Sequence, residues 1–167
     1  MRTTLFIVLL GFGFLTGCNN QPATIDHFKP DLSFSAEQAW DLMIGKWFGS
    51  QPTRDGFRRE WIAVRRSDGQ YRITFRNYDA DGTYRESVEF GEWGVDYPIY
   101  FSIFRGWIKD GVIKDANPYD PYNRDAYRIL SLDEHSMTYQ AISSKDVYTL
   151  TRVPDDFVFP TDEVTPD

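Results

Sequence analysis

The stretch Ile44-Gly45-Lys46-Trp47 marks the point where the sequence changes from a tether and a helix to a series of strands. Downstream of it, turn signals such as Asp68-Gly69 and Asp81-Gly82 recur at strand-length intervals. They predict eight strands, near residues 45–51, 57–66, 71–78, 83–93, 97–107, 124–132, 136–142 and 146–153. Because no helix pattern separates them, we expect an all-β, antiparallel up-and-down barrel without free edges.

A short helix is predicted immediately before this stretch. Ser35 and Gln38 have the spacing of a capping box, and an apolar stripe follows them. We therefore expect a helix over Ser35–Ile44 that ends at Gly45 and closes one end of the barrel.

The register of the strands can be predicted from the turns. Two-residue turns at Asp68-Gly69 and Asp81-Gly82 would place apolar side chains of three strands on one inward face. That predicted interior is Ile62, Val64, Ile73, Phe75, Val88 and Phe90, with Trp61, Arg72, Arg76, Arg85 and Glu89 outside. A further turn at Val95-Asp96 would add Ile99, Phe101 and Ile103 to the interior and bring Arg105 beside Glu86. In the last strands, one shared face is predicted for Leu130, Met137, Tyr139, Leu150 and Arg152.

Three residues at the two ends of the strand series resemble the signature of the lipocalins, or of a close calycin relative. Gly45 and Trp47 open the first strand, and Arg152 ends the last one. The resemblance implies that Trp47 lies at the closed end of a lipocalin-like barrel and that Arg152 packs across its ring as a cation against an aromatic face. The chain departs from the family at Asp133, where no Thr-Asp-Tyr motif appears, and after Val153, where no helix follows.

The N-terminus resembles the signal peptide of a bacterial lipoprotein. Arg2 precedes an apolar run over residues 5–15, which is short for a membrane span. Leu15-Thr16-Gly17-Cys18 resembles a lipobox, which implies that residues 1–17 are removed and that Cys18 is lipidated and anchors the protein in a membrane. The implied location is the bacterial cell envelope facing the periplasm, and Asn19 favours the outer membrane.

Outside the barrel, the remaining segments are predicted from their composition. Residues 18–34 are a polar, proline-containing tether, residues 35–153 form the barrel, and residues 154–167 form an acidic tail that is unstructured or loosely draped.

The composition argues against several kinds of partner and site. A net charge of -7 disfavours nucleic acid as a partner. One cysteine and two histidines leave little for a metal site or a nucleophile and base pair, so no metal and no cofactor are predicted. Five Asp and Asn residues between Asp115 and Asp125 fit no defined calcium loop, and turn chemistry explains them.

A row of polar residues is predicted to face inward at the end opposite Trp47. The candidate ligand-binding residues are Glu60, Asn77, Glu86, Arg105, Arg128, Tyr139 and Tyr148. Under one interpretation, Glu86 and Arg105 neutralise each other at a solvated rim. Under the other, an arginine and a tyrosine of this row bind the head group of a small amphipathic ligand. The segment over residues 108–123 is long for a hairpin loop and is a candidate lid.

Three function classes follow from these expectations. The first is a lipid-anchored barrel that binds a small apolar or amphipathic ligand without catalysis. The second is a structural or interaction lipoprotein with a filled barrel and an outer patch of Trp61, Arg72 and Arg76 that docks on an envelope protein. The third and weakest is an enzyme that uses Glu60 and Glu86 as an acid and base pair in one pocket. An interior cavity favours the first class, and a filled interior the second.

Overall fold

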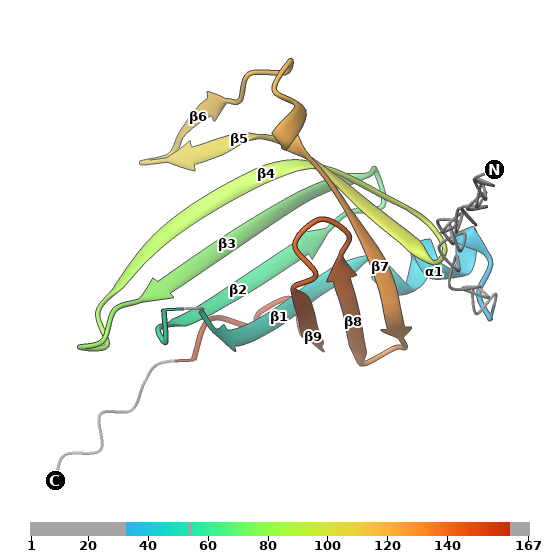
Figure 1. Cartoon of the computed structure of the whole chain (residues 1–167), viewed down its shortest axis with the longest axis horizontal. Helices are drawn as coiled ribbons and strands as arrows, with labels where there is room; N and C mark the ends of the chain where they lie inside the picture. Colours follow the sequence, from blue (N-terminus) through green and yellow to red (C-terminus); the bar gives the residue numbers. More distant parts are fainter. Residues whose placement is uncertain (1–32, 54, 161–167) are drawn as a thin grey trace, which may run out of the picture.

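The computed structural model describes residues 33–53 and 55–160, beginning with the predicted helix. Helix α1 (Ala36–Met43) has Ser35 as its N-cap, and Ser35 and Gln38 form the predicted capping box. Ala39 and Met43 on its inner face are fully buried. The helix lies across one end of the strands and closes it (Figure 1).

All eight predicted strands are present, and a ninth short strand is added. They are β1 (Gly45–Pro52), β2 (Arg58–Arg65), β3 (Gln70–Tyr78), β4 (Tyr84–Asp96), β5 (Ile99–Lys109), β6 (Val112–Asp115), β7 (Arg124–Leu132), β8 (Ser136–Ala141) and β9 (Val147–Val153). The additional strand β6 lies within the segment that was predicted to be a long loop.

The strands close into the expected antiparallel barrel. Their order is β4-β3-β2-β1-β9-β8-β7-β5, and a direct pairing of β4 with β5 completes the ring. The prediction of an eight-stranded up-and-down barrel with a short N-terminal helix is therefore confirmed. Strand β6 pairs with β5 outside the ring, and the β5–β6 hairpin stands away from the barrel (Figure 1).

The predicted register is wrong by one residue at two turns. Arg66 pairs with Gln70 and Asp79 with Thr83, so each turn has three residues and ends in a glycine with positive φ. Ile62 therefore faces Thr74 instead of Phe75, and Thr74 faces Val88. Ile73 and Phe75 point inward as predicted. Because one slipped residue reverses a strand's faces, the side chains on the outer face are Ile62, Val64, Val88 and Phe90, and those inside include Trp61 and Glu89.

Two bulges and a shifted turn explain the other register differences. Asp96 pairs with Ile99 around Tyr97-Pro98, and the β4–β5 pairing then shifts between Phe90 and Gly91. Phe101 lies between Tyr100 and Ser102, which line the cavity, so it points outward and is 41% exposed. Leu130 alternates with the inward-facing Ile129 and is 50% exposed, and a second irregularity between Ile129 and Ser131 then brings Leu132 inward opposite Met137. Met137, Tyr139 and Leu150 are buried together as predicted, whereas Ile129 and Leu132 take the place expected for Leu130.

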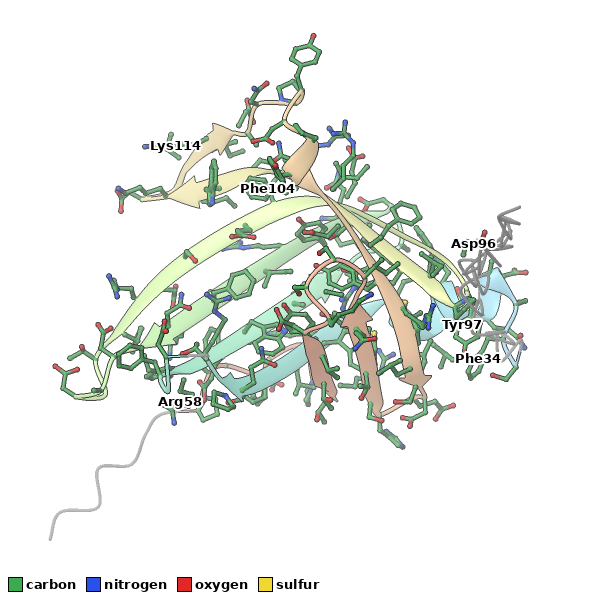
Figure 2. All side chains as sticks on the ribbon, in the orientation of Figure 1. Phe34, Arg58, Asp96, Tyr97, Phe104 and Lys114 are labelled. Carbon is green, nitrogen blue, oxygen red and sulfur yellow. The ribbon has the colours of Figure 1, made fainter. Side chains whose placement is uncertain are left out.

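The closed end is held by contacts that satisfy its polar groups. Trp47 is fully buried and donates its indole N–H to the Met43 carbonyl at 3.0 Å. The Arg152 guanidinium lies 4.3 Å from the Trp47 ring centroid and donates to the carbonyls of Leu42, Ile44 and Glu134. Nearby, Phe34 and Tyr97 meet edge to face at 5.5 Å (Figure 2). The closed-end roles implied for Trp47 and Arg152 agree with this geometry.

The first part of the predicted acidic tail packs on the outside of the barrel. Phe159 is 7% exposed, and the Phe157 ring lies 5.2 Å from the Phe48 ring. The Lys46 ammonium donates to the carbonyls of Asp155 and Phe157, both at 2.7 Å. Residues 154–160 therefore cover apolar side chains of the outer face, which explains why β2 carries Ile62 and Val64 on that face.

Candidate ligand-binding cavity

The barrel interior contains a cavity that opens at the end opposite α1. Its inner part has a volume of about 120 Å³ and its outer part about 360 Å³. The two parts have in common Arg59, Ile73, Phe75, Ser102 and Tyr127, so they form one continuous funnel. A larger hollow of about 610 Å³ lies outside the ring, between the outer face of β3 and β4 and the β5–β6 hairpin. We regard the interior cavity as the candidate site because all the side chains that line it, except Tyr122 in the 3-10 turn Pro121–Asn123, come from seven barrel strands.

Aromatic rings form the inner part of the cavity. Tyr100 stacks on Tyr127 at 5.1 Å, and both meet the Tyr139 ring near 5 Å. Tyr148 adds a fourth ring 5.5 Å from Tyr139, and Trp61 meets Tyr148 edge to face at 6.0 Å. We call Tyr100, Tyr127, Tyr139 and Tyr148 the tyrosine cluster. Its rings present apolar faces to the cavity, and phenol hydroxyls supply its polar groups.

Arg65 lies beneath the tyrosine cluster and is 2% exposed. Its Nη2 donates to the Tyr100 hydroxyl at 3.2 Å, and its guanidinium carbon lies 4.9 Å from the Tyr100 ring centroid. Its Nε and Nη1 have no hydrogen-bond partner among the described residues. An arginine keeps its charge at any physiological pH. A buried positive charge therefore lies directly below the floor of the cavity.

The mouth of the cavity carries both signs of charge. Arg59 donates to the Asn77 side-chain oxygen at 2.7 Å. Glu89 and Asp125 also line the outer part. Burial raises the pKa of the Glu89 carboxyl, and burial also raises the pKa of the Asp125 carboxyl. These two side chains are the carboxylates that line the outer part of the cavity.

Three of the seven predicted site residues face the cavity. Asn77 lies at the mouth, and Tyr139 and Tyr148 belong to the tyrosine cluster. Their predicted inward position agrees with the structure.

The inward position predicted for the other four is wrong. Arg105 forms an exposed ion pair with Glu92 at 2.9 Å rather than lying beside Glu86, because it alternates with the cavity-lining Ser102 and Phe104 and therefore points outward. Arg128 is exposed. Glu86 pairs with Arg76 at 3.1 Å on the outer face.

Glu60 also differs from its expected environment. It is buried on the outer face of β2, where its carboxylate accepts from the Tyr78 hydroxyl at 3.0 Å and lies 3.5 Å from Arg58. Glu60 and Glu86 therefore do not meet in one interior pocket, and the predicted acid and base pair loses its geometry. The predicted outer patch is also incomplete, because Trp61 is 3% exposed and faces the cavity.

The sequence interpretation missed several residues of the cavity. They are Arg59, Trp61, Arg65, Tyr71, Ser87, Glu89, Tyr100, Ser102, Phe104, Trp107, Tyr122, Asp125 and Tyr127. The alternation of Arg59, Trp61 and Arg65 in β2 was a usable signal. It would have indicated an inward face only if the preceding and following turns had been counted as three residues.

Within residues 33–53 and 55–160, no three His, Cys, Asp or Glu side chains gather as a metal site. In the same part of the chain, no helix is both long enough and apolar enough to cross a membrane.

Comparisons with known proteins find similarity in solved structures alone. No family model matches the chain, and no curated protein matches it. One matching solved structure is a lipocalin-like protein from Bacteroides uniformis, at 15% identity and a TM-score of 0.38, over 66% of this chain and 97% of that one. The assignment of the barrel fold is therefore based on the strand pairing observed in this chain.

Proposed function

We propose that the barrel binds a small amphipathic molecule in its interior cavity and performs no chemistry on it. The observation that carries this proposal is the funnel lined by the tyrosine cluster and open at the mouth. Cavities that bind small molecules are mostly apolar and aromatic, with a few polar groups that orient the ligand. Eight strands leave room for one small ligand.

The displaced aromatic residues support the same proposal. Phe90 and Phe101, which were expected to fill the interior, lie on the outer face instead. Their absence from the interior leaves space above the tyrosine cluster. A filled interaction module is less well supported, because its interior would have no such space and its predicted outer patch lacks Trp61.

Native mass spectrometry of the full chain, purified from its own host, tests the proposal directly. We expect a bound small molecule that survives purification. Ser102→Leu should remove it, because Ser102 lines both parts of the cavity and a larger side chain would occupy the inner 120 Å³.

Arg105→Ala is the matched control, since Arg105 lies outside the ring in an exposed ion pair. This variant should retain the ligand. An empty wild-type cavity, or equal retention by Ser102→Leu and Arg105→Ala, would contradict ligand binding inside the barrel.

We also propose that the barrel is attached to a bacterial envelope membrane through Cys18. The proposal depends on the lipobox resemblance of residues 15–18, which lie outside the described residues. Acyl chains on Cys18 would hold the protein at a membrane without a spanning helix. Cys18→Ser should move the protein from the membrane fraction to the soluble fraction, and unchanged membrane attachment would refute the lipobox assignment.

A further inference from the structure

Arg65 is a buried cation that lacks a counter-ion and part of its hydrogen-bond acceptors among the described residues. Two of its three nitrogens have no hydrogen-bond partner among the described residues, and no carboxylate of those residues forms an ion pair with it. Burying a charge without a counter-ion is costly. A buried cation of this kind therefore indicates a missing acceptor.

Tyr100 connects the Arg65 cation to the cavity, because its hydroxyl binds Arg65 and the residue lines the inner part. A guanidinium can only donate, so the Tyr100 oxygen accepts from Arg65, and its own hydrogen must be directed to another acceptor. Tyr100 lines the inner cavity. A hydroxyl that already accepts from a cation is a stronger donor, because hydrogen bonds in a chain polarise one another.

Tyr139 supplies a second donor at the same depth. It is 7% exposed and lines the inner cavity beside Tyr100, with ring centroids 5.3 Å apart. Burial raises the pKa of Tyr139 far above its ordinary value, although the nearby Arg65 cation and its hydrogen bond to the Tyr139 hydroxyl oppose the shift. The hydroxyl therefore stays protonated and remains able to donate.

The two ends of the cavity consequently differ in charge. The carboxylates that line it, Glu89 and Asp125, lie only in its outer part, Arg59 lines both parts, and the inner part is lined by the tyrosine cluster above Arg65. An anionic or acceptor group gains at the floor, and a cationic group would meet an unfavourable field there.

We propose that the ligand enters with a carboxylate first, so that this group accepts hydrogen bonds from Tyr100 and Tyr139 above Arg65. This inference depends on the ligand-binding function proposed above. The inner 120 Å³ holds the carboxylate and the first atoms attached to it, and the wider 360 Å³ holds an aryl or alkyl body near Phe75 and Ile73. The predicted class of ligand is a small aryl or alkyl carboxylic acid.

A pair of probes that differ only in the end group tests the orientation. 4-Phenylbutyrate and 4-phenylbutylamine have the same ring and chain with opposite charges. Titration calorimetry on the full chain should show tighter binding of the carboxylate, by about tenfold or more, because charge-assisted hydrogen bonds form only with this probe. Equal binding of the two probes, or tighter binding of the amine, would overturn the orientation and leave the cavity itself intact as a binding site.

Two single-atom variants locate the interaction. Tyr100→Phe and Tyr139→Phe keep both rings and remove one hydroxyl each, so each should weaken carboxylate binding by about tenfold and leave amine binding nearly unchanged. Tyr84→Phe is the matched control, because Tyr84 is 47% exposed and lies under Arg76 away from the cavity. If all three variants bind the carboxylate like the wild type, the tyrosine hydroxyls do not hold the carboxylate.

Arg65→Met provides an independent readout. It removes the cation beneath the floor, so the ratio of carboxylate to amine affinity should fall toward one even if both probes still bind. A folded Arg65→Met protein that keeps the wild-type ratio would contradict the role of Arg65. If neither probe binds wild type and native mass spectrometry finds no ligand, both this inference and the proposed function fail; if a native ligand is found while neither probe binds, only the inference fails.

Discussion

Two arginines at different levels of the barrel have opposite relationships with their surroundings. Arg152 at the closed end donates to three backbone carbonyls and lies 4.3 Å above the Trp47 ring. Arg65, beneath the tyrosine cluster, interacts with the hydroxyls of Tyr100 and Tyr139 and has two unpartnered nitrogens. The first is a structural cation whose partners belong to the chain. The second is a cation whose partner, under our proposal, is brought by a ligand.

The comparison shows how scaffold and site can be separated within one small barrel. At the closed end, the indole of Trp47 and the guanidinium of Arg152 find their acceptors in α1, at its C-cap Ile44 and at Glu134 in the turn between β7 and β8. At the cavity floor, donors outnumber acceptors. Replacing a structural group should cost stability, whereas replacing a group kept for binding should cost little stability or add some. The following variants test that division.

The largest effect is expected for Trp47→Ala. Trp47 is fully buried at the closed end, so truncation should lower the free energy of unfolding by about 3–5 kcal/mol. Urea denaturation followed by circular dichroism measures it. Trp107→Ala is the control, since Trp107 is 44% exposed and should cost far less. Comparable losses in the two variants would mean that the closed end is no more structural than the hairpin.

Gly45→Ala should have the next largest effect. Gly45 has a φ of +117°, and a Cβ there would lie 2.6 Å from Arg152 Nη1, so we expect a loss of about 2–3 kcal/mol. Gly82→Ala is a matched control with a φ of +82° and no atom within 4 Å of the added carbon. The difference between the two in thermal unfolding isolates the displacement of Arg152. No difference would show that Arg152 adjusts freely.

Arg65→Met should change stability in the opposite direction. Replacing a poorly paired buried charge by an apolar side chain of similar length should raise the free energy of unfolding by about 1 kcal/mol. Arg152→Met sharpens the contrast, because it leaves three carbonyls without their donor and should lower stability by about 2 kcal/mol. Urea titrations of both variants give the comparison. A clear loss of stability in Arg65→Met would show that Arg65 stabilises the fold as Arg152 does, and would contradict the proposed difference between the two arginines.

The smallest effect is expected for Arg105→Ala. Its ion pair with Glu92 is exposed, and such pairs contribute less than about 1 kcal/mol. The midpoint of urea unfolding should therefore stay close to that of the wild type, with a slight dependence on salt. A loss as large as that of Gly45→Ala would show that the bulge in β5 depends on this pair.

The fold was predictable because its signals are local and redundant. The capping box of Ser35 and Gln38 and the spacing of the turns were sufficient to place the helix and eight strands. The site was not predictable at the same level, because it depends on which face of each strand points inward. Asp68-Gly69 is compatible with both a two-residue turn and the end of a three-residue turn, and the choice reverses β3 relative to β2.

The position of apolar residues usually shows which face of a strand points inward, but in this barrel the outer face is apolar as well. Ile62 and Val64 are apolar although they point away from the cavity, and Phe157 to Phe159 cover part of this face. An interior of arginine, tyrosine and glutamate beneath an apolar exterior is the reverse of the alternation expected for a soluble barrel strand. A rule that places the apolar face inside therefore selects the wrong register in β2 and β4.

The irregular pairing of β5 has a consequence for local stability. Its first half pairs with both β4 and β7 inside the ring, whereas residues beyond Gly106 pair with β4 and β6 in the hairpin that stands away from it (Figure 1). Amide hydrogen exchange should therefore divide this one strand into two cooperative units. Amides from Tyr100 to Ile103 should exchange only through global opening, and those from Trp107 to Lys109 through a separate, less costly opening of the hairpin.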